Sequence, residues 1–221
     1  MRNLEIKNQN GRSMIEMLGV LAIIGVLSVG GIAGYSKAMM KYRINKTIEQ
    51  ITLIAGNVRT FFAPQKSYEG VNKNKILRKA KIIPDEMWYS DTSIINVFGY
   101  GVYVENAYKS TSGDNKAFKI TYKLPSSEEN FCIELLSQDW TDVGIIGIQI
   151  NAPHTATTNV SNLTVPISIE DAVTACTKAT NAIITAGSSS LIGTKASMIQ
   201  VIFYFDVNSN CWSETNGNTC S

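Results

Sequence analysis

The amino-acid sequence predicts an α+β fold, in which a long N-terminal helix packs on an antiparallel β-sheet with short peripheral helices. Three observations support this prediction. An apolar run without a charged side chain extends from Met17 to Ser36. An apolar pattern with helical spacing then continues on one face until Pro64. Beyond that proline, short segments with strand-like patterns alternate with turn residues and with two helix-start signals.

The apolar run is long enough to cross a membrane. Its 20 residues, 17–36, form about 30 Å of α-helix, the thickness of the hydrocarbon core of a bilayer. A secretory signal peptide is shorter and is followed by a cleavage site of small residues. Here Tyr35, Lys37 and two methionines follow. We therefore expect a membrane-spanning helix that stays in the mature chain.

Past the membrane, helical periodicity continues on one face only. Charged and polar residues occupy the other face, and Pro64 ends the pattern. The prediction is one helix of about 50 residues, about 75 Å long, whose second half needs a domain to cover its stripe. The apolar positions of that stripe are Ile44, Ile48, Ile51, Ile54, Ala55, Val58, Phe61 and Phe62.

Residues 65–95 form a connector with one short helix that ends before Pro84. The segment "NKNKILRKAKIIPDEM" carries basic residues at 73, 75, 78, 79 and 81, with apolar residues between them. We interpret the basic residues as the solvated face of an amphipathic helix, in preference to a surface for DNA or membrane.

Strand patterns dominate the next part of the chain. "GVYVEN" (101–106) and "AFKITYKL" (117–124) predict an antiparallel hairpin, with its turn at Gly113, Asp114 and Asn115. "VGIIGIQIN" predicts another strand, and "MIQVIFYF" (198–205) is apolar enough for a central one. Residues 151–166, rich in Thr and Asn with two prolines, predict an exposed loop.

Two helix-start signals lie between these strands. Ser126 with Glu129 three residues later forms a capping-box pattern that opens a short helix with Cys132. Ser168 with Asp171 opens a second short helix, which carries Cys176.

Composition argues against several classes of function. The 221 residues suffice for one anchored globular domain, and the net charge of +2 is too small for a dedicated nucleic-acid binder. The single histidine, His154, argues against a His-based catalytic triad or a multi-histidine metal site. Asp139 and Asp142 are typical of a turn more than of a Ca²⁺ site. We expect no enzymatic activity, no cofactor, no metal and no nucleic-acid partner.

All 4 cysteines, Cys132, Cys176, Cys211 and Cys220, lie far along the chain. An even number in a membrane-tethered domain favours disulfides and an oxidising compartment, so we expect the C-terminal domain in the periplasm or outside the cell. Basic residues flank the apolar run on both sides and do not decide its orientation. Four cysteines allow three connectivities, which the sequence alone leaves open.

The N-terminal stretch "GRSMIE", followed by the apolar run, resembles the class III signal of type IV prepilins and pseudopilins. In that family a prepilin peptidase removes a short polar leader after its last glycine. The resemblance implies that residues 1–11 are the leader, that cleavage follows Gly11, and that Arg12 becomes the new N-terminus. Glu16 then matches the glutamate of the family. Arg12 stands where the family usually has an apolar residue, which leaves N-methylation of the new amine open.

Glu16 acquires a physical role in that picture. After cleavage, the charged amine would lie about 6 Å of helix from Glu16. In a bundle of apolar helices an unpaired carboxylate is costly, and the positive N-terminus of a neighbouring subunit offsets that cost. We therefore interpret Glu16 as an assembly residue that sets axial register.

Later segments resemble type IVb pilins. These are the "N-x-F-G" step into the sheet, "AFKITY", the cysteine-bearing helix, and "A-x-x-A-C-x-x-A" before the last strand. By this resemblance Cys132 pairs with Cys176, which leaves Cys211 for Cys220. It also implies a leader (1–11), a transmembrane and filament-core helix half (12–36), an amphipathic helix half (37–63) and a globular head domain (64–221).

The resemblance implies a structural subunit of a type IVb-like pilus. Its partners are then copies of itself, the prepilin peptidase, the inner-membrane assembly platform and, before assembly, the membrane. The precursor would span the inner membrane once with a periplasmic head, and later join a cell-surface pilus or a periplasmic pseudopilus. Two alternatives remain open: a pseudopilin of a type II secretion system, and an anchored exported domain that never polymerises.

Overall fold

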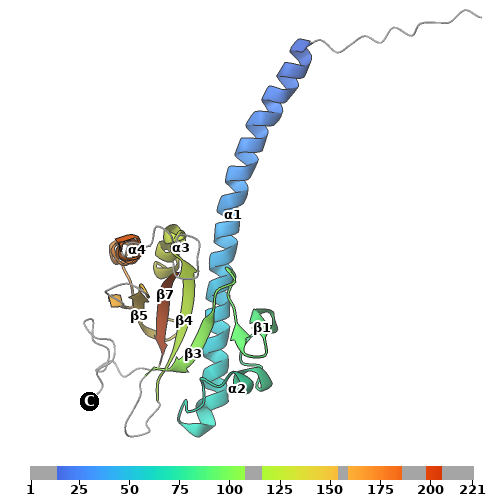
Figure 1. Ribbon diagram of the computed structural model, residues 1–221. Helices are drawn as coiled ribbons and strands as arrows, with labels where there is room; N and C mark the ends of the chain where they lie inside the picture. Colours follow the sequence, from blue (N-terminus) through green and yellow to red (C-terminus); the bar gives the residue numbers. More distant parts are fainter. Residues whose placement is uncertain (1–13, 108–115, 154–158, 186–197, 206–221) are drawn as a thin grey trace, which may run out of the picture. The chain divides into compact units, whose positions relative to one another are not determined.

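The computed structural model describes residues 14–107, 116–153, 159–185 and 198–205 (Figure 1). The chain divides into two compact units, Met1–Tyr42 and Arg43–Ser221. We call them the N-terminal unit and the head unit, and describe each by itself. The boundary falls within helix α1 (Met14–Phe62), which contributes to both.

Helix α1 has 49 residues and is followed by the 3-10 turn η1 (Ala63–Gln65), which contains Pro64. The prediction of a single helix of about 50 residues that ends near this proline is therefore confirmed. The fold class is also confirmed, because within the head unit the second half of α1 packs on an antiparallel sheet.

The part of α1 in the head unit buries one stripe. The predicted stripe is correct at six positions, but Ile48 is only half-buried and Phe61 is 40% exposed. Two polar residues, Thr47 and Gln50, take part in the buried face instead. The buried residues of α1 are Ile44, Thr47, Gln50, Ile51, Ile54, Ala55, Val58 and Phe62.

The sheet has five strands in the order β3-β4-β7-β5-β6, and every neighbouring pair is antiparallel. The strands are β3 (Val102–Asn106), β4 (Phe118–Pro125), β5 (Ile145–Asn151), β6 (Asn159–Thr164) and β7 (Met198–Phe205). The predicted β3–β4 hairpin is confirmed, and its predicted turn at 113–115 lies outside the described residues. β7 is the central strand, as its apolar sequence predicts, and all but one of its side chains are buried.

The expectation of a loop at 151–166 is wrong in its second half. β6 pairs antiparallel with β5, with Gly147 opposite Thr164 and Ile148 opposite Leu163. A strand at the edge of a sheet has one partner only, so it tolerates the polar residues that made this segment resemble a loop.

Helix α3 (Glu129–Leu136) begins differently from the prediction. Its N-cap is Glu128, and no side chain caps it. The predicted Ser126–Glu129 box does not form, because Glu129 instead accepts a 2.5 Å hydrogen bond from Thr177 of α4 (Ile169–Thr185). At the start of α4, by contrast, Ser168 Oγ accepts the Asp171 N–H at 3.1 Å, as predicted.

The connector holds the short helix α2 (Asn74–Lys79), which ends before Pro84, as predicted. A 3-10 turn, η2 (Asp85–Met87), leads into a two-stranded sheet of β1 (Trp88–Ser90) and β2 (Ser93–Ile94), which the sequence did not indicate. These strands are too short to show a periodic pattern.

A disulfide joins the two short helices of the head unit. Cys132 of α3 and Cys176 of α4 are bonded, their Cα atoms are 6.0 Å apart, and both residues are fully buried. The pairing implied by the family resemblance is thus confirmed. Cys211 and Cys220 lie outside the described residues, so their pairing stays a prediction.

Replacing Cys132 by Ser should destabilise the head unit by about 4 kcal/mol, because the bond closes a loop of 44 residues in the unfolded chain. Urea unfolding of the detergent-solubilised protein measures the change, and reduced wild-type protein is the matched control. Unchanged stability, or a free Cys132 thiol in non-reducing peptide maps of the wild type, would contradict this prediction.

Candidate assembly site

The N-terminal part of α1 exposes apolar side chains all around the helix. Between Met14 and Tyr35, the large apolar residues have exposed fractions from 49% at Met17 to 86% at Met14. The helix is long and apolar enough to span a membrane. An apolar surface of this extent indicates contact with a membrane or with other proteins.

Hydroxyl groups within the apolar stretch are satisfied by the helix itself. Ser28 Oγ donates to the Ile24 carbonyl at 2.7 Å, and Ser36 Oγ donates to the Ile32 carbonyl at 3.0 Å. Such internal bonds are what an apolar surrounding requires of polar groups. The stretch can therefore enter hydrocarbon, or a bundle of apolar helices, without an unpaired hydroxyl at these two positions.

Of the predicted processing and assembly residues, only Glu16 lies within the described part of the chain. Gly11 and Arg12 lie outside the described residues. Glu16 lies in the first turn of α1, and its side chain is exposed. It is the only charged residue of α1 before Lys37. The helix thus presents a single carboxylate at the start of its apolar surface.

Glycines interrupt the apolar surface at five positions: 19, 25, 30, 31 and 34. A Cβ atom at any of them would meet nothing within 4 Å. No contact among the described residues therefore requires glycine there, and two explanations remain, close approach of another helix or the ordinary composition of membrane helices.

In the head unit, a buried polar network fixes the rotation of α1 against the sheet. The hydroxyl of Tyr122, on β4, lies 3.0 Å from Thr47 Oγ1 and 3.5 Å from Gln50 Oε1. Burial raises the pKa of Tyr122 to about 12. An apolar stripe alone tolerates small rotations of a helix, whereas buried hydrogen bonds hold at one rotation only. The sequence did not reveal this network, although two polar residues inside an apolar stripe were a signal for it.

The network continues to the surface of the head unit. Gln50 Nε2 donates to Glu86 Oε1 at 3.3 Å, and Lys46 Nζ pairs with the same oxygen at 2.8 Å. The hydrogen bond from Lys46 lowers the pKa of Glu86. The Glu86 side chain is half exposed to solvent, so this ion pair contributes little to stability by itself.

Two arginines hold α1 at both ends of its buried stretch. Arg43 lies 3.8 Å from Glu128 at the start of α3 and stacks over the Phe98 ring at 5.1 Å. Arg59 donates to the carbonyls of Val143 and Gly144 at 2.7 and 3.0 Å. The two arginines are 16 residues apart, about 24 Å along the helix.

Gly144 makes the second contact geometrically feasible. Its φ of +74° suits glycine, and a Cβ atom there would lie 2.5 Å from Arg59 Nη2. The turn before it is built by Asp139, whose Oδ1 accepts the Thr141 N–H at 3.0 Å. The interpretation of Asp139 as a turn residue thus agrees with the structure, and the hydrogen bonds from Thr141 lower its pKa. No group of three or more metal-ligating side chains occurs within the described residues.

The effect of replacing Tyr122 by Phe on the free energy of unfolding should change sign between pH 7 and pH 12. At pH 7 the variant should be less stable than the wild type by about 1 kcal/mol, which is the contribution of a buried hydrogen bond to stability. Because the pKa of Tyr122 is raised in the folded state, its stabilising effect is complete below pH 10 and is lost as pH rises towards 12. The wild type should lose about 2 to 3 kcal/mol over that interval through this group, and the variant should not.

Urea unfolding between pH 7 and 12 measures both quantities. The control is Tyr89→Phe, because Tyr89 is 77% exposed and should change neither. Parallel pH profiles for the wild type and the Tyr122 variant would contradict the assigned burial.

Comparison with known proteins places the chain in a family. The model of the PilS N-terminal family matches residues 41–189, so the match begins after the apolar stretch. A search of curated proteins finds no match. Among solved structures, the crystal structure of a type IVb pilin from Salmonella typhi is 17% identical, with a TM-score of 0.45, over 75% of this chain and 98% of that one. On the strength of the family match, the chain belongs to the PilS N-terminal family of type IV pilins, which are structural subunits and not enzymes.

Proposed function

We propose that this protein is a subunit of a type IVb-like pilus, made as a membrane-anchored prepilin and polymerised through the N-terminal part of α1. One observation carries the proposal. A single helix is covered on one stripe by its own head unit from residue 44 onward, whereas its apolar side chains between Met14 and Tyr35 are exposed.

The exposed apolar surface is too large to remain in water. It comprises 13 large apolar side chains. At about 1.5 kcal/mol or more for each, burying them contributes about 20 kcal/mol. A bilayer supplies that burial before assembly, and the same segments of neighbouring copies supply it in a filament. The membrane is therefore the first partner and a second copy of the chain is the next.

Glu16 gives the assembly its register. Cleavage by a prepilin peptidase after Gly11 leaves a positive amine at Arg12, which can face the Glu16 carboxylate of an adjacent subunit. In an apolar bundle this pairing favours one axial offset, because any other offset leaves the carboxylate without a counter-charge. The inner-membrane assembly platform then acts on a mature subunit whose head lies in the periplasm.

Mass spectrometry of the mature N-terminus and electron microscopy of cells labelled against the head unit test the proposal together. We expect a chain that begins at Arg12 and labelled filaments on the cell surface. A chain that still begins at Met1 would exclude a processed pilin. Processed protein confined to the periplasm would instead indicate a pseudopilus.

Gly11→Val should block processing, because a branched side chain next to the scissile bond does not fit where glycine does. The protein should then accumulate in the inner membrane at precursor mass, which immunoblots of membrane fractions detect. Normal maturation of this variant would refute the assigned cleavage site.

Glu16→Gln should leave membrane insertion and cleavage intact, since a neutral amide costs less than a carboxylate in apolar surroundings. Filaments should be few or absent, because the amine of the neighbour loses its counter-charge. Filament yield after shearing measures the effect.

Glu49→Gln is the matched control for that experiment. It makes the same change at an exposed carboxylate of the same helix, within the head unit, where Glu49 pairs with Lys46 at 3.2 Å. The control should assemble normally. If Glu16→Gln gives as many filaments as the wild type, Glu16 does not set the axial register, and Arg12 and the head units would set it instead.

A further inference from the structure

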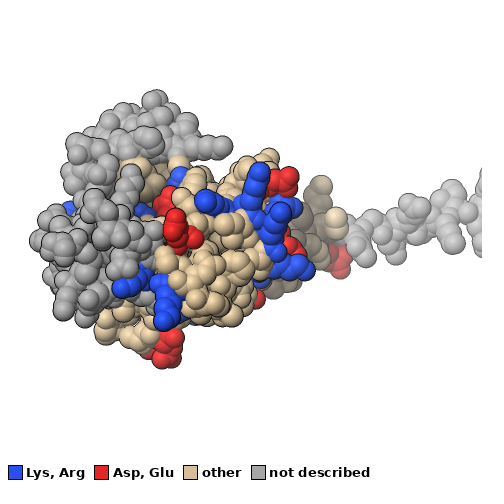
Figure 2. All heavy atoms as spheres, turned by 90° about the horizontal axis from the view of Figure 1, so that it is seen from below, with Lys and Arg blue, Asp and Glu red and all other residues tan. Residues whose placement is uncertain are grey.

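Positive charge collects on one end of the head unit. Lys73, Lys75 and Lys79 lie on α2 and its flank, with Lys66 and Lys81 nearby, and all five are exposed. Within the described residues none of the five forms an ion pair. Figure 2, which shows the molecule from below, has blue side chains gathered on parts of the described surface, with red side chains among them. We call these five lysines the basic surface.

Arg78 belongs to the same helix but is occupied within its own chain. Its guanidinium pairs with Asp91 at 2.7 Å and stacks over the Trp88 ring at 5.2 Å. It therefore helps to hold α2 against the small β1–β2 sheet, and the lysines around it remain available for another molecule.

Negative charge collects on the two disulfide-linked helices. Residues 128–136 contain three glutamates and no basic residue, and α4 adds two acidic residues in its first turn against a single lysine, Lys178. We call this the acidic surface. Its exposed members are Glu170 and Asp171. Glu128, Glu129 and Glu134 are partly buried beside them, and Glu128 is paired with Arg43.

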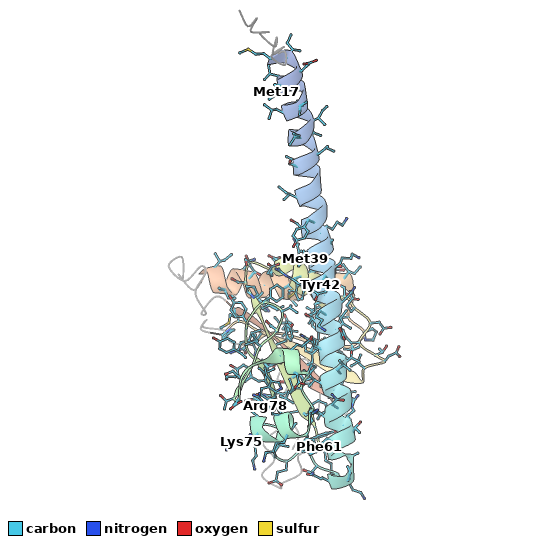
Figure 3. The ribbon with its side chains drawn as sticks, turned by 90° about the vertical axis from the view of Figure 1, so that its right-hand side faces the viewer. Met17, Met39, Tyr42, Phe61, Lys75 and Arg78 are labelled. Atoms are coloured by element: carbon cyan, nitrogen blue, oxygen red, sulfur yellow. A yellow bond between two sulfur atoms is a disulfide. The ribbon has the colours of Figure 1, made fainter. Side chains whose placement is uncertain are left out.

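The two surfaces lie at opposite ends of the head unit. Glu128 contacts Arg43 of α1, whereas the segment after α2 contacts Asn57, whose Nδ2 donates to the Ile82 carbonyl at 2.9 Å. These two residues of α1 are about 21 Å apart along the helix. Figures 1 and 3 agree, with α4 at one end of the head unit and α2, marked by Lys75 and Arg78, at the other.

We propose that the basic surface of one subunit docks on the acidic surface of a second copy of this chain in the assembled filament. The inference rests on the proposed function. Two different surfaces that complement each other make a head-to-tail contact, which extends into an open polymer and does not close as a symmetric dimer does. The geometry thus matches the need of a filament.

Charge complementarity also supplies what the apolar helix lacks. Burial of apolar side chains is not directional, so it brings subunits together without choosing which sides of the heads meet. Exposed opposite charges steer approach and disfavour the wrong faces, because like charges repel. A near-neutral chain that carries both signs at opposite ends fits a second copy better than it fits a nucleic acid.

Charge reversal in the full-length chain tests the docking in cells that assemble the filament. Lys75→Glu combined with Lys79→Glu should lower the yield of sheared filaments about tenfold, and Glu170→Lys should lower it as well. All three changes together should restore much of the yield, because the surfaces complement each other again with reversed sign. Restoration would also exclude misfolding as the cause of the losses.

Lys178→Glu is the matched control. It reverses the same type of charge on an exposed lysine of α4, but it adds to the acidic surface and should leave the yield unchanged or higher. An intact Cys132–Cys176 bond in each variant confirms that the head unit is folded.

Three outcomes would overturn the docking. If the charge-reversal variants give the same filament yield as the wild type, the docking is rejected and the proposed function stands. Losses without restoration, together with wild-type filaments that bind DNA through the lysines, would assign the basic surface to a polyanion instead. A processed wild-type chain that forms no filament would reject both proposals.

Discussion

The apolar surface of helix α1 has to be covered, and its own chain covers only part of it. From residue 44 onward one stripe packs on the sheet, while the large apolar side chains between Met14 and Tyr35 stay exposed. The head unit packs against the covered part. The central strand β7 supplies an apolar surface, and Trp140 closes it against Phe203 at 5.1 Å between ring centroids. The uncovered part carries the proposal that the chain enters a membrane and then binds copies of itself.

Polar contacts, and not apolar ones, define how α1 lies on the sheet. The Tyr122 hydroxyl selects one rotation through Thr47 and Gln50, and arginines at 43 and 59 fix both ends of the buried stretch. The disulfide supports the first of these ends, because it holds α3, whose N-cap residue Glu128 is the partner of Arg43.

Sequence patterns predicted the large elements and missed the features that depend on contacts between distant residues. The length of α1 followed from spacing and from Pro64, and the central place of β7 followed from its continuous apolar residues. β6 was missed because an edge strand needs few apolar residues. The box at Ser126 failed because Glu129 bonds to Thr177, 48 positions away in sequence. The role predicted for Glu16 stays a prediction, because it depends on a neighbouring molecule that no single chain contains.

Helical reconstruction of sheared filaments by electron microscopy would show what covers α1 between Met14 and Tyr35. We expect a filament core in which this part of each helix packs against the same part of neighbouring copies, with Glu16 facing an adjacent N-terminal amine. Filaments in which side chains such as Leu21 face solvent, or in which Glu16 meets no positive group, would contradict assembly through this part of α1.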